Sequence, residues 1–203
     1  MIAYSHYIWD FDGTLFDSYP HSIAALCAAA EHYGIPADPN AVSQAIHINF
    51  ATAYRLLGLT LEQLALFHDL RARRDFLPPV TPFPGVQKAL EALCMRGAKH
   101  YLFTHSSRHM SVDYLEEYGL AGLFTDFVTA DLHFPAKPAP DGILYLLQRH
   151  AIPPKTAAMV GDREIDILSG RNAGIDGILF DPEASVSETQ ARYRIRTFSE
   201  LLN

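Results

Sequence analysis

The sequence predicts an α/β fold, in which a parallel sheet is sandwiched by helices and an all-helical subdomain is inserted after the first strand. Three observations support this prediction. Short apolar runs alternate with longer helical stretches through most of the 203 residues, which is typical of a parallel sheet with crossover helices. Residues 18–82 interrupt that alternation and show only helical periodicity. A proline-dense stretch at 78–85 closes the interruption and suits a hinge.

The expected elements follow in chain order. We expect strands at 7–9, 99–104, 127–129, 156–160 and 177–180. We expect helices at about 85–96, 108–118, 140–150 and 164–173. Three of these helices are followed by a glycine, the residue that most often ends a helix in a left-handed turn: Gly97, Gly119 and Gly174.

The inserted segment reads as a small helical subdomain. Its apolar residues recur at helical spacing in three groups, which are Ile23, Leu26, Cys27 and Ala30, then Tyr54, Leu57 and Leu61, then Leu64, Phe67 and Leu70. We therefore expect a sheet domain made of residues 1–17 and 83–203, with residues 18–82 forming the insertion.

Composition excludes several function classes. The chain has 23 acidic and 16 basic side chains, a formal charge of −7, which argues against nucleic acid or an anionic membrane as partner. Two cysteines, Cys27 and Cys94, cannot form a disulfide framework and suggest a reduced, intracellular protein. No export signal or membrane-spanning apolar run is visible, so we expect a cytoplasmic protein. No pattern for assembly stands out, and we expect a monomer or weak dimer.

Polar residues follow the expected strands where each one ends. The carboxyl ends of parallel strands lie along one edge of a sheet, where ligands bind. The residues concerned are Asp10, Asp12, Thr104 and Asp162, with Asp166 four residues after Asp162. Lys137 opens the helical stretch near residue 140, and we expect it at the same edge. Carboxylates packed together repel one another unless a cation intervenes, and carboxylate oxygens favour a hard cation such as Mg²⁺, which shares its ligand shell with phosphate.

These motifs resemble those of a known family. DFDGT at 10–14, Thr104, KPAP at 137–140 and GDREID at 161–166 match, in order and spacing, the four motifs of the haloacid dehalogenase-like (HAD) superfamily. The subgroup that the chain resembles is the phosphoglycolate phosphatase and β-phosphoglucomutase type. This resemblance implies a Rossmann-like core with a helical cap inserted after the first motif. It also implies a small phosphorylated metabolite as substrate.

The resemblance also implies catalytic roles. Asp10 would be the nucleophile and would form an aspartyl phosphate, because a carboxylate is already ionised at neutral pH. Asp12 would protonate the leaving oxygen and then activate water, for which its pKa must be raised. Thr104 would hydrogen-bond the phosphoryl group, and Lys137 would neutralise its charge.

The same resemblance implies a Mg²⁺ site. Asp10, Asp162 and the backbone carbonyl of Asp12 would ligate the ion. Asp166 would bind it directly or through water.

Substrate contacts are predicted at three further positions. His105 follows Thr104, and its backbone N–H or its ring is placed to meet the substrate. His47 lies where this subgroup often has a substrate-reading loop, although a core or surface histidine is the simpler interpretation. Arg71 belongs with Arg73 and Arg74 to a run whose simplest interpretation is a solvated helix face paired with Asp69 and Asp75.

Within the family, two branches are disfavoured. True haloacid dehalogenases lack the aspartate that corresponds to Asp12. Phosphonoacetaldehyde hydrolases use a cap lysine, and residues 18–82 contain none. A hydrolase is the preferred interpretation, and the alternatives are a β-phosphoglucomutase-like mutase and a non-catalytic phosphate-sensing protein.

Overall fold

The computed structural model describes residues 2–73 and 78–203, and it divides into two compact units. One consists of Met1–Phe16 and Pro82–Asn203, and the other is Asp17–Thr81. The sequence predicted the smaller unit at residues 18–82, so each predicted boundary lies one residue further along the chain than the boundary in the structure. The crossing segments, β2 (Phe16–Asp17) and β3 (Thr81–Pro82), pair as a two-stranded sheet.

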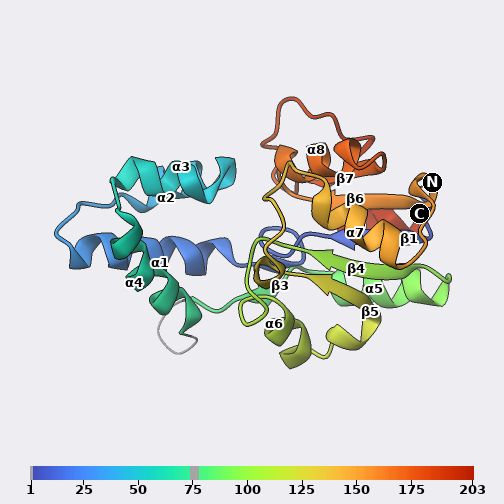
Figure 1. Cartoon of the computed structure of the whole chain (residues 1–203), viewed down its shortest axis with the longest axis horizontal. Helices are drawn as coiled ribbons and strands as arrows, with labels where there is room; N and C mark the ends of the chain where they lie inside the picture. Colours follow the sequence, from blue (N-terminus) through green and yellow to red (C-terminus); the bar gives the residue numbers. More distant parts are fainter. Residues whose placement is uncertain (1, 74–77) are drawn as a thin grey trace. The chain divides into compact units, whose positions relative to one another are not determined.

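The larger unit is built on a six-stranded sheet in the order β5-β4-β1-β6-β7-β8 (Figure 1). Every neighbouring pair is parallel, as predicted. The strands are β1 (His6–Trp9), β4 (Lys99–Phe103), β5 (Phe124–Val128), β6 (Ala157–Gly161), β7 (Asp176–Phe180) and β8 (Tyr193–Ile195). β8 was not predicted, because a three-residue edge strand is too short to show an alternating pattern.

Helices cover both faces of this sheet. They are α5 (Val86–Met95), α6 (Val112–Glu117), α7 (Asp141–Arg149) and α8 (Glu164–Asn172). Short 3₁₀ turns lie at η1 (Ala121–Leu123), η2 (Ala130–Leu132), η3 (Pro154–Thr156) and η4 (Phe198–Leu202). The predicted helix at 108–118 is shorter than expected, since its first four residues form turns.

Alternating residues of β1 distribute the packing between the two faces. Ile8 belongs to a buried cluster with Ile143 and Leu146 of α7. On the opposite face, the Trp9 ring lies 6.1 Å from that of Phe198 in η4. Trp9 Nε1 also donates a hydrogen bond to His100 Nδ1 at 3.0 Å. The strand that precedes the polar loop is therefore fixed on both sides.

Apart from the ends of the crossing strands, the described residues of the smaller unit form helices and the loops that connect them. Its helices are α1 (Tyr19–His32), α2 (Pro39–Ile48), α3 (Phe50–Leu57) and α4 (Leu61–Ala72). A buried cluster that includes Leu26, Ile46 and Phe67 forms its core. The prediction that Leu61 shares a helix with Tyr54 and Leu57 was wrong. The chain breaks at Gly58 (φ +64), and Leu61 begins α4 with its side chain 89% exposed.

The two cysteines have no disulfide in the structure. Cys27 is buried in the helical unit and Cys94 is half-buried in α5. Among the described residues, no helix combines the length and the apolar character needed to span a bilayer.

Candidate active site

The loop after β1 places two carboxylates at the carboxyl edge of the sheet. Asp10 and Asp12 are 1% and 4% exposed. Gly13, at φ +76, turns the chain so that its N–H donates to Phe16 O at 2.9 Å. The Phe11 and Phe16 rings stack at 4.6 Å beneath the loop. Because these apolar side chains anchor the loop, the two carboxylates are held in place.

A buried lysine links two parts of the chain that are distant in sequence. Lys137 Nζ donates to Asp10 Oδ1 at 2.6 Å and to Asp166 Oδ1 at 2.8 Å. The lysine side chain has no exposed surface, and it lies 4.8 Å from the centre of the Phe103 ring. An ammonium buried in this way needs both carboxylates to offset its lost hydration.

Asp166 owes its position to a close approach of α8 to β6. A Cβ atom on Gly161 would lie 2.3 Å from Asp166 Cβ, so only glycine fits here. The second carboxylate oxygen of Asp166 accepts the Arg163 backbone N–H at 3.1 Å, at the start of α8. The GDREID sequence thus brings the last aspartate of its motif back onto the end of its own strand.

Asp162 completes a group of three carboxylates. One oxygen each from Asp10, Asp162 and Asp166 lies within 4.8 Å of the others. Thr14 Oγ1 donates to Asp162 Oδ1 at 3.2 Å. The side chain of Asp12 does not belong to this group. The predicted metal ligand at this position is the backbone carbonyl of Asp12.

The side chain of Asp12 interacts with the loop that follows β4. Its Oδ2 accepts a hydrogen bond from Ser106 Oγ at 2.5 Å. In the same loop, Thr104 Oγ1 accepts the Ser106 backbone N–H at 3.0 Å. The Thr104 hydroxyl proton therefore remains available for another acceptor.

Burial and charge determine the ionisation of these groups. Burial raises the pKa of Asp10 to about 7, against the opposing charge of Lys137. Burial alone would raise the pKa of Asp166, but the Lys137 and Arg163 cations hold it below its usual value. Burial would likewise lower the pKa of Lys137, yet Asp10 and Asp166 raise it. The lysine is therefore a permanent cation.

Comparison with known proteins decides the family. A family model described as haloacid dehalogenase-like hydrolase matches residues 7–180. The chain belongs to this family. A phosphoglycolate phosphatase of Vibrio vulnificus is 31% identical over 183 residues, which cover 82% of this chain and 78% of the relative. The prediction of a HAD-like hydrolase is thereby confirmed.

Solved structures agree with this assignment. A hydrolase from Streptococcus pneumoniae is 35% identical, with a TM-score of 0.63 over 89% of this chain and 94% of the other. A HAD-superfamily hydrolase, subfamily IA, variant 1, from Geobacter sulfurreducens is 26% identical, with a TM-score of 0.72 over 98% of each chain.

The carboxylate group of this HAD-like chain fits a divalent cation. Asp10 Oδ2 is buried and has no hydrogen-bond partner among the described residues. An anionic oxygen in that setting lacks the donors that would offset its lost hydration. With Asp162 and Asp166 close by, three carboxylate ligands would suit a hard ion.

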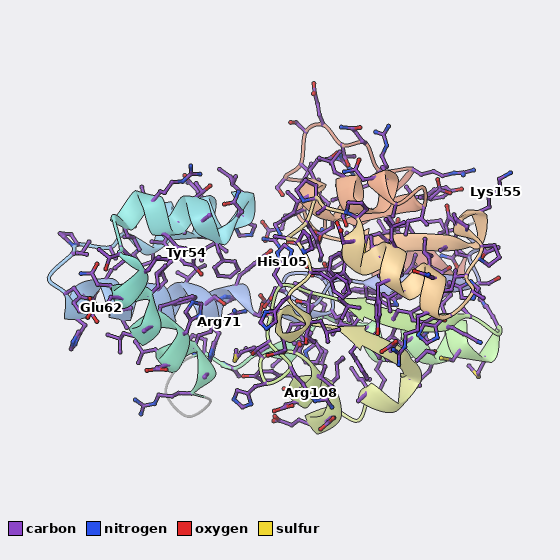
Figure 2. The ribbon with its side chains drawn as sticks, viewed as in Figure 1. Tyr54, Glu62, Arg71, His105, Arg108 and Lys155 are labelled. Carbon is purple, nitrogen blue, oxygen red and sulfur yellow. The ribbon has the colours of Figure 1, made fainter. Side chains whose placement is uncertain are left out.

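His105 contributes to this HAD-like site in a way the sequence did not reveal. The residue, labelled in Figure 2, follows β4, and its Nε2 accepts the Lys137 backbone N–H at 2.8 Å. The ring thus ties the loop after β4 to the residue that carries the buried ammonium. The substrate contact expected of His105 stays a prediction.

Two residues of the helical unit were predicted to contact substrate, and Arg71 is labelled in Figure 2. His47 is exposed in the last turn of α2, where Nδ1 contacts Ser43 O at 2.8 Å. Arg71 is buried, with Nε donating to Ser22 Oγ at 3.0 Å and the guanidinium 5.2 Å from the Phe50 ring centre.

The solvated face expected for Arg71 was therefore wrong, because this arginine packs inside its own unit. Arg73 is exposed, and Arg74 and Asp75 lie outside the described residues. The assignment of His47 and Arg71 to substrate binding stays a prediction.

Two residues have contacts at the site that the sequence did not predict. Ser106 contacts the Asp12 carboxylate through its hydroxyl. Arg163 was not predicted as a site residue, although it directly follows Asp162 in the GDREID motif. The signal that could have identified Arg163 was a basic residue among the three acidic residues of this motif, Asp162, Glu164 and Asp166.

Proposed function

We propose that this chain is a Mg²⁺-dependent phosphatase that hydrolyses a small phosphorylated metabolite through a phosphorylated Asp10. The observation that carries the proposal is the buried Lys137 ammonium, which bridges Asp10 and Asp166 beside a third carboxylate, Asp162. Such a group holds a carboxylate nucleophile against a cation, and the negative charge that remains would favour a divalent cation where a phosphate ester would be attacked.

The first step uses the acid–base pair at the loop after β1. The Asp10 carboxylate attacks phosphorus, and the bond to the leaving oxygen breaks as that oxygen takes a proton from Asp12. Lys137 and the Thr104 hydroxyl stabilise the phosphoryl oxygens as their charge changes. The divalent cation, when bound, supplies further positive charge to the carboxylates and the phosphoryl group.

The second step releases phosphate. Asp12, now ionised, takes a proton from water, and the oxygen of that water attacks the phosphorus. The bond from phosphorus to Asp10 breaks, and inorganic phosphate leaves with both carboxyl groups restored to their starting states. Proton donation and acceptance by one side chain follows from microscopic reversibility.

The helical unit, Asp17–Thr81, is proposed as the substrate-selecting cap domain. The relatives named phosphoglycolate phosphatase support a small phosphorylated acid as the first substrate to test. Sugar phosphates and nucleotides belong in the same panel.

The test is a phosphate-release screen with purified protein over phosphoglycolate, hexose phosphates, nucleotides and p-nitrophenyl phosphate. We expect turnover with Mg²⁺ and none in EDTA, with one small metabolite preferred. Interconversion of sugar phosphates stimulated by a bisphosphorylated sugar, with little phosphate release, would support the mutase instead. Binding of beryllofluoride without any turnover would support a phosphate sensor.

Ser106→Ala tests whether the hydroxyl positions Asp12. Without the 2.5 Å hydrogen bond, the carboxyl group of Asp12 loses its fixed orientation. We expect kcat to fall about 10- to 100-fold for an alkyl phosphate, whose leaving oxygen needs a proton. The loss should be much smaller for p-nitrophenyl phosphate, whose leaving group departs unprotonated.

The control for this variant is Ser185→Ala, which removes a serine hydroxyl that donates to another carboxylate, Asp181. Steady-state kinetics with the two substrates is the measurement. An equal loss with both substrates would indicate a purely structural role for Ser106.

A further inference from the structure

Arg163 places a second cation among the carboxylates of the site. It lies at the start of α8, directly after Asp162, and is 8% exposed. Its Nη2 is 3.9 Å from Asp10 Oδ2, and its Nε is 4.0 Å from Asp162 Oδ1. These distances are longer than hydrogen bonds, but they are well within the range at which charges interact in a buried site.

The two cations face different oxygens. Lys137 Nζ donates hydrogen bonds to Oδ1 of both Asp10 and Asp166. Arg163 faces Oδ2 of Asp10 and Oδ1 of Asp162. Because Lys137 occupies the other Asp10 oxygen, the oxygen beside Arg163 is the one left for a divalent cation.

The charge balance of the group is nearly complete without a metal ion. When Asp10 is ionised, the three carboxylates carry three negative charges, and Lys137 and Arg163 supply two positive ones. A guanidinium keeps its charge at every pH that a folded protein experiences. Its attraction to the carboxylates and its repulsion of an incoming cation are therefore both permanent.

We propose that Arg163 is a resident cation of the metal site, which stabilises the carboxylates while no divalent ion is bound and weakens the binding of that ion. This inference rests on the proposed function, since it takes Asp10, Asp162 and Asp166 as the metal site. If the proposal holds, the site binds its divalent ion weakly and exchanges it readily. The protein also stays folded when no ion is bound.

The competing role for Arg163 is a direct contact with the transferring phosphoryl group. The 3.9 Å gap between Nη2 and Asp10 Oδ2 is wide enough for one bridging oxygen atom. Arginine also binds phosphate well. The two roles differ in what they do to metal affinity when no substrate is present, and the experiment uses that difference.

The experiment compares Arg163→Gln and Arg163→Lys with the wild-type chain and with Arg171→Gln. Arg171 is an exposed arginine on the same helix, bound to Gln190. Mg²⁺ and Mn²⁺ affinity is measured by calorimetry without substrate, and Tm is measured in EDTA and in saturating Mg²⁺.

We expect Arg163→Gln to bind Mg²⁺ at least about tenfold more tightly, since one unit charge at 4–6 Å shifts the affinity for a proton by a factor of about 10 to 1,000. Its Tm in EDTA should fall, and its gain in Tm on adding Mg²⁺ should exceed that of the wild type. Arg163→Lys and Arg171→Gln should resemble the wild type in metal affinity.

Unchanged or weaker metal binding by folded Arg163→Gln would overturn the proposal. Unchanged metal binding together with weaker binding of inorganic phosphate would assign Arg163 to the phosphoryl group. If Arg163→Gln does not fold in EDTA, refolding on addition of Mg²⁺ supports the proposal, and failure to fold in both conditions contradicts it. A wild-type chain that binds no divalent cation would contradict the proposed function itself.

Discussion

Asp10→Asn is expected to lower the rate of phosphate release by about 10,000-fold or more, because an amide cannot attack phosphorus as a carboxylate does. The side chain keeps its shape, and its carbonyl oxygen can still accept the hydrogen bond from Lys137. Asp166 still pairs with that lysine at 2.8 Å. The variant should therefore fold, so that lost activity reports on chemistry.

Two measurements make this prediction specific. Acid quenching with ³²P-labelled substrate should trap covalently bound phosphate in the wild-type chain and none in Asp10→Asn. Asp141→Asn, which neutralises an exposed carboxylate in the first turn of α7, is the matched control and should behave as the wild type. A phosphate-release rate of Asp10→Asn within tenfold of the wild-type rate would contradict the assignment of Asp10 as the nucleophile.

Lys137→Met is expected to affect both stability and activity. The variant keeps a side chain of similar length but leaves Asp10 and Asp166 buried together without their shared cation. Breaking a buried ion pair on one side typically costs about 3–5 kcal/mol. We expect the free energy of unfolding to fall by that order and phosphate release to fall about 100- to 1,000-fold.

Urea denaturation and steady-state kinetics check these two effects. Lys155→Met, at an exposed position in η3, is the control and should change neither quantity. Saturating Mg²⁺ should restore part of the lost stability of Lys137→Met, because a divalent cation can neutralise the same carboxylates. A variant that is as stable as the wild type in EDTA would show that Lys137 does not hold the carboxylates together.

Much of the fold could be predicted from local patterns. The parallel sheet followed from apolar runs that alternate with helical stretches, and the six-stranded sheet confirms it. What the patterns missed are elements that depend on contacts with distant partners. β8 exists because Tyr193–Ile195 pairs with β7, and α2 was not predicted because its sequence, PNAVSQAIHI, buries only three residues.

For the candidate site, the positions of the residues could be predicted from the sequence, but their contacts could not. The strand-end positions of Asp10, Thr104 and Asp162 follow from the rule that the carboxyl ends of parallel strands lie along one edge. The partners of these residues do not follow from any rule of spacing. Ser106 and Asp12 are 94 positions apart, and His105 and Lys137 are 32 apart. Both pairings depend on how far each loop turns after its strand ends.

The sequence by itself determined the parallel sheet and the strand-end residues, because hydrophobic periodicity and turn residues act locally and repeat along the chain. Only the tertiary structure decided that Arg71 packs inside the helical unit and that Arg163 lies among the carboxylates. A long charged side chain can reach solvent or a buried anion from the same backbone position. The choice between them depends on which groups the rest of the fold brings within its reach.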